Sequence, residues 1–119
     1  ARAHRWRKMA GGGMRQAGVL AAAALHALDH HVERLAEDHA NARRLAEGLQ
    51  GLPGVTVAAP QSNIVFVDLA ADKPDDAVAR LRQRGVLATG LYKLRLVTHL
   101  DVSAEDIERA VPVLRAVLG

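Results

Sequence analysis

The stretch Asn63-Ile64-Val65-Phe66-Val67-Asp68-Leu69 decides the fold, because five of its seven side chains are large and apolar. A short, nearly continuous apolar run is typical of a strand that is covered on both faces. We therefore expect this stretch to be the central strand of a sheet. The elements predicted on either side of it in the sequence should pack around it.

Three elements are predicted before this strand. Residues 16–28 carry no charge and consist mainly of alanine, leucine and valine, which predicts a helix buried on most sides. Residues 55–57, after a turn at Leu52-Pro53-Gly54, predict a short edge strand. Between them, one stripe recurs at helical spacing and predicts a second helix, formed by Val32, Leu35, His39, Ala42, Ala46 and Leu49.

A helix and two strands are predicted after the central strand. Asp72-Lys73-Pro74, followed by acidic residues in the first turn, predicts the start of the helix, and Gly85 predicts its end. Residues 86–89 and 93–98 predict two strands with the close spacing of a hairpin.

The last element is a helix that Ser103 and Asp106 begin, because their spacing matches a capping box. Helices and strands mixed in this order predict an α/β (α+β) fold. We expect a small, mainly antiparallel sheet of three to four strands with helices packed on one face.

Composition limits the chemistry and the location of the chain. Half of the residues are hydrophobic but only three are aromatic, so the core should be aliphatic. Cysteine is absent, which excludes disulfides and thiolate nucleophiles and agrees with a reducing, cytoplasmic location. The apolar run of residues 19–28 is too short to cross a bilayer, so no membrane partner is expected.

The formal net charge of +3 is unevenly distributed along the chain. Five cations precede Ala17 with no acid among them: Arg2, Arg5, Arg7, Lys8 and Arg15. Such a segment can bind nucleic acid, bind a phosphate ligand, or be solvated without a binding role. A single Trp6 supplies no series of stacking platforms, so nucleic acid is not expected as a partner.

A triple glycine, Gly11-Gly12-Gly13, connects these cations to the apolar helix. Successive glycines give access to positive φ, which we expect at Gly12, and they allow backbone N–H groups to turn toward an anion. We therefore divide the chain into a basic, glycine-rich segment, residues 1–16, and a domain formed by residues 17–119.

Four stretches together resemble the low-specificity L-threonine aldolases: Arg5-Trp6-Arg7-Lys8-Met9, Gly11-Gly12-Gly13-Met14-Arg15-Gln16-Ala17-Gly18, Val32-Glu33-Arg34-Leu35-Ala36-Glu37-Asp38-His39-Ala40-Asn41-Ala42 and Leu94-Arg95-Leu96-Val97-Thr98-His99-Leu100-Asp101-Val102-Ser103. That family depends on pyridoxal 5′-phosphate (PLP) and has an aminotransferase-like, type I fold. The resemblance implies the C-terminal small domain of such an enzyme, with residues 1–16 leading from an upstream PLP-binding domain. It also implies a homodimer or homotetramer that acts on a small amino-acid substrate.

Arg95 is the predicted substrate-binding residue. Strand alternation places Lys93, Arg95 and Val97 on the face opposite the helices, where a planar guanidinium is held on a rigid element. By resemblance, Arg95 matches the arginine that binds the α-carboxylate of the amino acid, a task suited to a bidentate donor. The alternative is a solvated strand arginine.

Lys8 and Arg15 are predicted to bind the cofactor or to lie at a subunit interface. In enzymes that this chain resembles, the segment lies beside the active site at such an interface, where cations can approach a phosphate or a substrate. The alternative is a role limited to helix capping and interface salt bridges.

No catalytic group is expected within the chain itself. None of its lysines, Lys8, Lys73 and Lys93, stands in the setting that the family uses for the Schiff-base lysine, which the resemblance places upstream. The histidines nearest to a metal pattern are His26, His30 and His31, but no third acid or histidine completes an enzyme motif, so no metal is expected.

The resemblance thus implies an enzyme that cleaves the Cα–Cβ bond of L-threonine or L-allo-threonine to give glycine and acetaldehyde. Without the upstream lysine, the chain itself should be inert. Two alternatives remain: a free-standing α/β regulatory or interaction module, and a β-eliminating lyase of the same superfamily.

Overall fold

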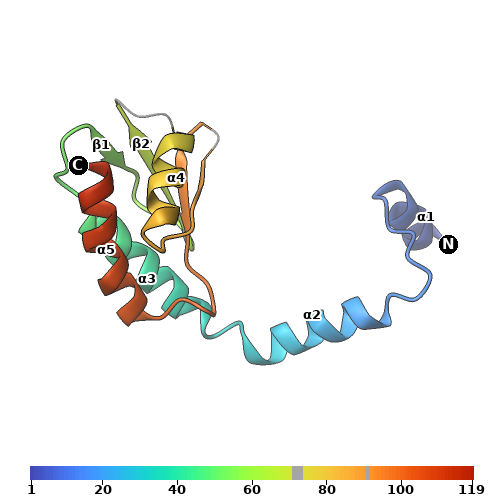
Figure 1. Cartoon of the computed structure of the whole chain (residues 1–119). Helices are drawn as coiled ribbons and strands as arrows, with labels where there is room; N and C mark the ends of the chain where they lie inside the picture. Colours follow the sequence, from blue (N-terminus) through green and yellow to red (C-terminus); the bar gives the residue numbers. More distant parts are fainter. Residues whose placement is uncertain (71–73, 91) are drawn as a thin grey trace. The chain divides into compact units, whose positions relative to one another are not determined.

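The computed structural model describes residues 1–70, 74–90 and 92–119 (Figure 1). Asp72 and Lys73, which are predicted to begin a helix, therefore lie outside the described residues, as does Leu91. The chain forms two compact units, Ala1–Glu33 and Arg34–Gly119. The basic, glycine-rich segment of residues 1–16 lies in the first unit, together with the apolar helix that follows it.

The first unit consists of two helices, α1 (Arg2–Met9) and α2 (Gly18–His30), and contains no buried side chain. The sequence pattern did not predict α1, although arginine, lysine, alanine and methionine all favour helix. Leu20 and Leu25 of α2 are each 60% exposed, so the first unit by itself does not supply the cover that the apolar sequence of α2 predicts. Within the unit Ala1–Glu33, none of its apolar side chains is buried.

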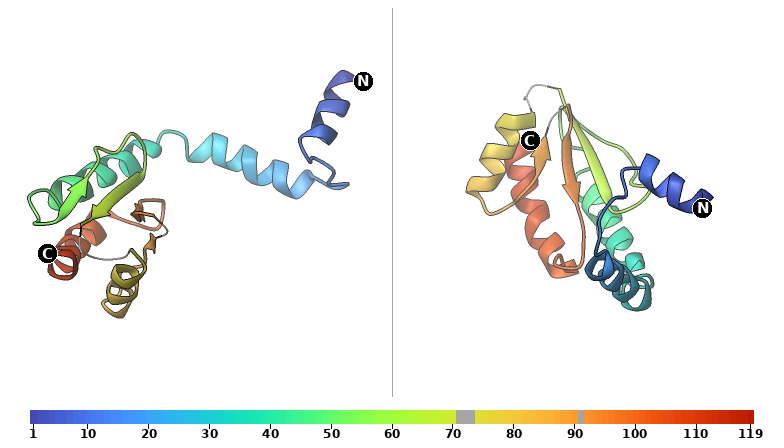
Figure 2. Two further views of the ribbon diagram at one scale, coloured as in Figure 1. Left: turned by 90° about the horizontal axis from the view of Figure 1, so that it is seen from above. Right: turned by 90° about the vertical axis from the view of Figure 1, so that its right-hand side faces the viewer.

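The second unit is built on a four-stranded sheet with the order β1-β2-β4-β3, in which every neighbouring pair is antiparallel. The strands are β1 (Val55–Val57), β2 (Ile64–Leu69), β3 (Thr89–Gly90) and β4 (Leu94–Val97). The helices are α3 (Leu35–Gly48), α4 (Pro74–Gln83) and α5 (Ala104–Leu118). Figure 2 shows α4 and α5 on the same side of the strands. The predicted fold class is confirmed.

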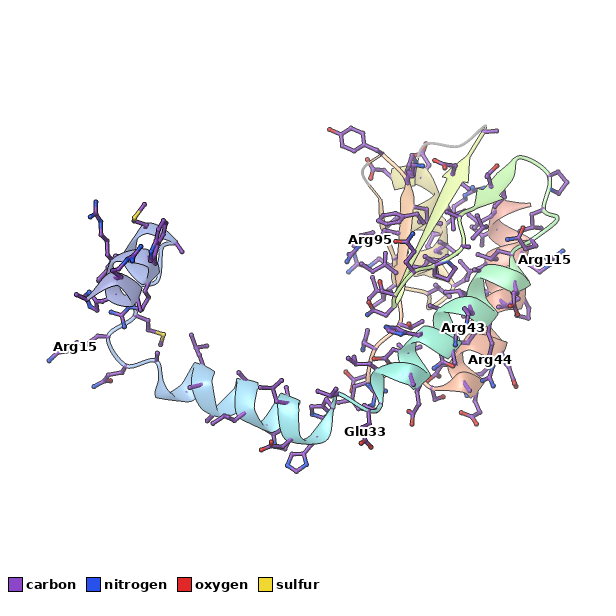
Figure 3. All side chains as sticks on the ribbon, turned by 180° about the vertical axis from the view of Figure 1, so that it is seen from behind. Arg15, Glu33, Arg43, Arg44, Arg95 and Arg115 are labelled. Carbon is purple, nitrogen blue, oxygen red and sulfur yellow. The ribbon has the colours of Figure 1, made fainter. Side chains whose placement is uncertain are left out.

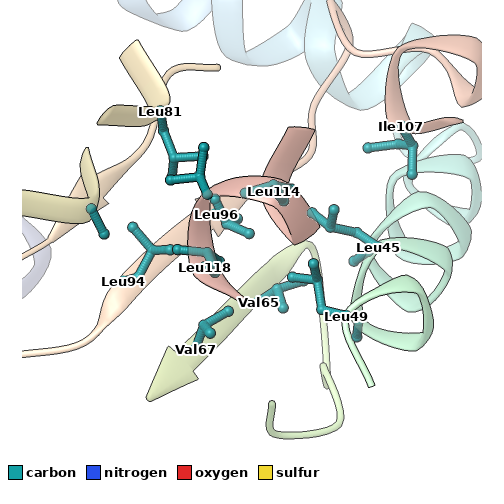
Figure 4. Close-up of a cluster of buried hydrophobic side chains, with 14 residues drawn as sticks. Leu45, Leu49, Val65, Val67, Leu81, Leu94, Leu96, Ile107, Leu114 and Leu118 are labelled. Atoms are coloured by element: carbon teal, nitrogen blue, oxygen red, sulfur yellow. The ribbon is translucent and has the colours of Figure 1, made fainter. Parts of the chain in front are cut away.

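The core lies between the sheet and the helices (Figure 4). The sheet contributes Val65 and Val67 from β2 and Leu94 and Leu96 from β4, each at most 4% exposed. The helices and their ends contribute the other buried apolar side chains: Ala42, Leu45, Ala46, Leu49, Ala77, Leu81, Ile107, Leu114, Val117 and Leu118. The core is aliphatic, as the composition predicted.

The central strand is covered on one face only. β2 lies between β1 and β4, as a central strand should, but Phe66 is 44% exposed and Asp68 is exposed as well. The prediction that both faces are covered is therefore wrong. The apolar character of Phe66 predicts that its side chain is buried, whereas the side chain lies on the face that the helices leave open.

The end of α4 explains why the third strand is shorter than predicted. Gly85 has a φ of +81°, and the N–H of Val86 donates to the carbonyl of Leu81 at 3.0 Å. These are features of a Schellman ending, which uses the Val86 N–H that a strand would need. β3 accordingly comprises Thr89–Gly90 in place of the predicted residues 86–89.

The predicted capping box of α5 is confirmed. The Ser103 hydroxyl accepts a hydrogen bond from the Asp106 N–H, and the Asp106 carboxylate accepts one from the Ser103 N–H. α5 continues through Pro112 to Leu118.

The glycine bend has its positive φ at Gly11, at +84°, and not at Gly12 as predicted. Gly12 is constrained differently, because its N–H donates to the Arg7 carbonyl at 2.8 Å. A Cβ on Gly12 would lie 2.9 Å from that oxygen and 2.7 Å from Arg7 Cγ. The close approach to the backbone of α1, and not the sign of φ, therefore requires a glycine there.

None of the helices in the described parts of the chain is long and apolar enough to cross a membrane.

Candidate functional site

The face of the sheet that the helices leave open carries Arg95. In the β2–β4 register Arg95 lies opposite Phe66, and in the β3–β4 register it lies opposite Thr89. Its neighbours along β4, Leu94 and Leu96, point into the core. Alternation along the strand therefore places Arg95 on the open face, as predicted.

The Arg95 guanidinium is unpaired within the part of the chain that the structure describes. The side chain is partly buried, yet no residue among 1–70, 74–90 and 92–119 forms an ion pair with it or accepts a hydrogen bond from it. Figure 3 shows Arg95 on β4, apart from Arg43 and Arg44 on α3 and Arg115 on α5. A partly desolvated cation without a counter-ion favours an anion from outside the domain.

A concave surface of about 520 Å³ surrounds this arginine. The described residues that line it combine apolar and cationic side chains, with no acid among them: Ala58, Phe66, Thr89, Gly90, Tyr92, Lys93 and Arg95. The planar fork of a guanidinium can bind a carboxylate through two parallel hydrogen bonds, and Phe66, opposite Arg95 in the register, adds apolar surface to the same lining. This arrangement can hold and orient a small carboxylate.

Lys93 is the second cation of this surface, and it has a partner. Its Nζ donates to Asp68 Oδ2 at 2.7 Å, and the two side chains are each 50% exposed. Among the described side chains that line the concave surface, Arg95 is therefore the cation whose charge is not compensated within the domain.

Two sequence stretches that carried the resemblance meet in space. The Thr98 hydroxyl, fully buried after the end of β4, donates to the backbone oxygen of Asp38 in α3 at 2.7 Å. Asn41 Nδ2 donates to the Val102 carbonyl at 3.1 Å. Sequence reasoning did not assign a role to these polar residues. All four residues belong to the two stretches that resemble the threonine aldolases, which was the signal that could have pointed to them. The structure shows that their hydrogen bonds join α3 to the segment after β4.

Asn63 fixes β4 from the other side. Its Nδ2 donates to the Thr98 carbonyl at 2.7 Å, and its own carbonyl accepts from the Thr98 N–H at 3.0 Å. The register that places Arg95 opposite Phe66 is thus continued beyond the end of β4. These contacts hold the strand that carries the guanidinium.

Asp38 is a buried carboxylate with a paired cation. It is 3% exposed, and Arg34 donates to both of its oxygens, at 3.0 and 3.1 Å. The bidentate pair satisfies the charge at the start of α3. It supports the helix that Thr98 contacts and is not part of the open face.

Lys8 and Arg15, the other predicted site residues, lie in the first unit. Both are exposed and neither forms a hydrogen bond or ion pair with another described residue. Lys8 Nζ lies 3.6 Å from the position that a Cβ on Gly13 would occupy, so its side chain passes over the glycine bend. Arg15 precedes α2, whose N-cap Ala17 supplies no capping side chain, so the first N–H groups of α2 remain open to an anion.

The histidines of α2 lie close together. The ring centroids of His26 and His30 are 4.5 Å apart, and those of His26 and His31 are 5.3 Å apart. Within the residues that the structure describes, no group of three or more histidine, cysteine, aspartate or glutamate side chains is arranged to hold a metal ion. The absence of a metal remains a prediction.

Comparisons with known proteins agree with the geometry. The family model described as beta-eliminating lyase matches residues 1–72. The chain is 44% identical over 118 residues to the low specificity L-threonine aldolase of Escherichia coli K12, covering 99% of this chain and 35% of that protein. It is 45% identical over 112 residues to the probable low-specificity L-threonine aldolase 2 of Arabidopsis thaliana, covering 87% of this chain and 32% of that protein. The chain thus spans about a third of the length of these relatives.

A solved structure also resembles this one. MppP soaked with the product 2-ketoarginine superposes with a TM-score of 0.62 at 25% identity, over 77% of this chain and 30% of that protein. The similarity to the threonine aldolases that the sequence motifs predicted is confirmed.

Proposed function

Because the chain belongs to the beta-eliminating lyase family, we propose that it is the C-terminal part of a lyase that cleaves L-threonine or L-allo-threonine to glycine and acetaldehyde. The enzymes of this family depend on PLP. The single observation that carries the proposal is Arg95, a partly buried cation on the open face of the sheet that has no ion-pair or hydrogen-bond partner among the described residues.

Arg95 is proposed to bind the α-carboxylate of the amino acid. When bound, PLP withdraws electrons from the substrate Cα, so the bond that breaks is the one held perpendicular to the cofactor ring. A guanidinium on β4 that binds the carboxylate through two hydrogen bonds fixes the orientation of the substrate groups about Cα. It thereby holds the Cα–Cβ bond perpendicular to the cofactor ring. Phe66, opposite Arg95 in the β2–β4 register, supplies an apolar neighbour on the same lining.

Lys8 and Arg15 are proposed to face the cofactor phosphate or a subunit interface. The uncapped N–H groups at the start of α2 suit an anion, and Arg15 lies just before them. The Lys8 side chain passes over Gly13, and a Cβ at Gly13 would lie beside the Lys8 amine. The donors present therefore fit a phosphate.

The remaining parts of the proposal concern the whole protein. An upstream domain, preceding residues 1–16, would supply the lysine that binds PLP, so the 119-residue chain should be inert by itself. The enzyme is proposed to be a cytoplasmic homodimer or homotetramer. The sequence supports the proposal that the 119-residue chain is inactive, because none of its three lysines stands in the setting that the family uses for the Schiff-base lysine.

Replacing Arg95 tests the proposal directly. Arg95→Ala in the full-length enzyme should lower kcat/KM for L-threonine by roughly thirty- to a thousand-fold, because it removes a charge-assisted contact worth on the order of 2–4 kcal/mol. Arg95→Lys should recover only part of the activity, since an ammonium is not a planar fork. Arg43→Ala, at an exposed position of α3, serves as the matched control. Near-wild-type kcat/KM in Arg95→Ala would refute the assignment.

Lys8→Ala and Arg15→Ala test the cofactor role. Each should weaken PLP retention or turnover without altering thermal unfolding, because both side chains are exposed. Unchanged cofactor affinity and kinetics would assign both residues to the interface alone.

The family description favours one second candidate, β-elimination. That reaction also begins with a carboxylate held by an arginine, but it breaks a bond at Cβ and releases a keto acid in place of glycine. Product analysis of the full-length enzyme with L-threonine separates the two, since aldol cleavage yields glycine and acetaldehyde. A free-standing regulatory module would show neither product.

A further inference from the structure

Two cations occupy adjacent positions along one face of the sheet. Arg95 lies opposite Phe66, and one step further along the same register Lys93 lies opposite Asp68. Residues two apart on a strand share a face and are separated by roughly 7 Å. One cation thus faces an aromatic ring, and the other faces a carboxylate at 2.7 Å.

This difference determines the charge that a ligand meets. Both cations line the concave surface, whereas Asp68 does not, so Asp68 neutralises Lys93 from beside the surface. A carboxylate bound at Arg95 finds one uncompensated charge. A second carboxylate on the same ligand, reaching toward Lys93, would meet the negative charge of Asp68 and would have to displace it.

We propose that Asp68 is a specificity-determining residue, which occupies Lys93 so that the site takes substrates with one carboxylate and discriminates against dicarboxylates. The inference rests on the proposed function, in which Arg95 binds the α-carboxylate. The pair is half exposed, so it is not required for folding, and its charge can be removed without opening the core. In Asp68→Asn the shape of the side chain is kept and Lys93 becomes a second free cation.

The test measures binding to the 119-residue chain and does not depend on catalysis. Butyrate and succinate, a monocarboxylate and a dicarboxylate of four carbons each, are titrated at pH 7.5 and followed by the Arg95 Nε–H and nearby backbone amide signals in ¹H–¹⁵N NMR spectra. For wild type we expect a larger dissociation constant for succinate than for butyrate, because the second carboxylate of succinate meets the negative charge of Asp68. For Asp68→Asn we expect a preference for succinate of about three- to tenfold, as for one partly exposed ion pair gained.

Three controls isolate the charge of Asp68. Asp68→Glu keeps the carboxylate and should keep the wild-type ratio. Adding Lys93→Gln to Asp68→Asn should abolish the succinate preference. Asp75→Asn, at an exposed position of α4, makes the same change in net charge and should leave the ratio unchanged.

The proposal is overturned if Asp68→Asn gives a dispersed, folded spectrum with an unchanged ratio, or if Asp68→Glu also prefers succinate. It is overturned as well if neither carboxylate shifts the Arg95 signal of wild type. Failure of the proposed function has a different signature. A full-length enzyme that does not cleave L-threonine refutes the activity, but it leaves the measured ratio and its response to Asp68→Asn as they stand.

Discussion

Thr98 and Asp38 lie 60 residues apart in the sequence and are joined by a 2.7 Å hydrogen bond from the Thr98 hydroxyl to the Asp38 backbone oxygen. The same threonine is bonded through its backbone to Asn63, before β2. Thr98 therefore ties the end of β4 to α3 and to β2 at once. Since Arg95 lies three positions earlier on β4, this junction holds the strand on which the proposed carboxylate site depends.

Removing the hydroxyl of Thr98 should destabilise the domain with little change in shape. Thr98→Val replaces it by a methyl group of similar size and should lower the free energy of unfolding by about 1–2 kcal/mol, because a buried hydrogen bond is lost. Urea denaturation followed by circular dichroism measures the loss. Thr89→Val, at an exposed position of β3, is the control and should change stability little. Equal effects of the two variants would show that the buried bond contributes nothing.

Gly48→Ala should destabilise the domain although it improves helix propensity. A Cβ on Gly48, the last residue of α3, would lie 2.8 Å from both Cγ atoms of Val111 in α5. Overpacking typically costs 1–3 kcal/mol, against a propensity gain of about 1 kcal/mol at most, so we expect a net loss of about 1 kcal/mol. Combining it with Val111→Ala should recover part of the loss caused by Gly48→Ala. A Gly48→Ala variant more stable than wild type would show that the two helices can separate freely.

Acid should weaken the start of α5. The pKa of Asp106 is lowered by the backbone N–H of Ser103, then by the Ser103 hydroxyl and Arg109, and the pKa of Glu105 is lowered mainly by a backbone hydrogen bond. A carboxyl with a lowered pKa stabilises the folded state above its unfolded pKa, and this contribution is lost as pH falls through the folded pKa. The free energy of unfolding should therefore fall as the pH is lowered below roughly 4.

The capping residues provide the comparison for this pH dependence. Urea denaturation at pH 7 and pH 3.5 should show a smaller acid loss for Asp106→Asn and for Ser103→Ala than for wild type. Asp106→Asn removes the titrating carboxyl, and Ser103→Ala removes the hydroxyl that helps to lower its pKa. Identical acid losses in all three proteins would mean that the capping box does not couple to pH.

The apolar face of α2 should make the 119-residue chain self-associate. Leu20, Leu25 and Leu28 are between 60% and 65% exposed, and an apolar surface of this kind favours association in water. Sedimentation velocity over a range of concentrations should show reversible oligomers for wild type and a shift toward monomer for Leu20→Glu/Leu25→Glu. Leu87→Glu changes a leucine that is 78% exposed in the second unit and should leave association unchanged. A wild-type chain that stays monomeric at high concentration would contradict the prediction.

Local signals in the sequence predicted the second unit well. β1 begins and ends at the predicted residues, and the capping box of α5 and the glycine that ends α4 are found where the pattern placed them. These features depend on residues within a few positions of each other, such as Ser103 and Asp106. Alternation along β4 likewise sufficed to put Arg95 on the open face.

The features that were missed depend on partners remote in the sequence. Whether Phe66 is covered depends on which face of β2 the helices take, and the pairing of Thr98 with Asp38 depends on how α3 packs. Apolar character alone could not show that α2 buries no side chain within the unit Ala1–Glu33. The ion pair of Lys93 with Asp68 was equally out of reach, since it requires the β2–β4 register.

The first unit, which buries no side chain, contributes little to the thermodynamics of unfolding. Heat capacity changes arise from apolar surface that becomes hydrated, so they should reflect the 86 residues from Arg34 to Gly119. At 12–15 cal/mol/K per residue this gives about 1.0–1.3 kcal/mol/K, against about 1.4–1.8 for a chain that is cooperative throughout. In the monomeric chain, α2 buries no side chain within its unit and should lose helicity gradually on heating, as an isolated peptide does. A single melting curve of this chain therefore combines one cooperative transition with a broad, uncooperative slope.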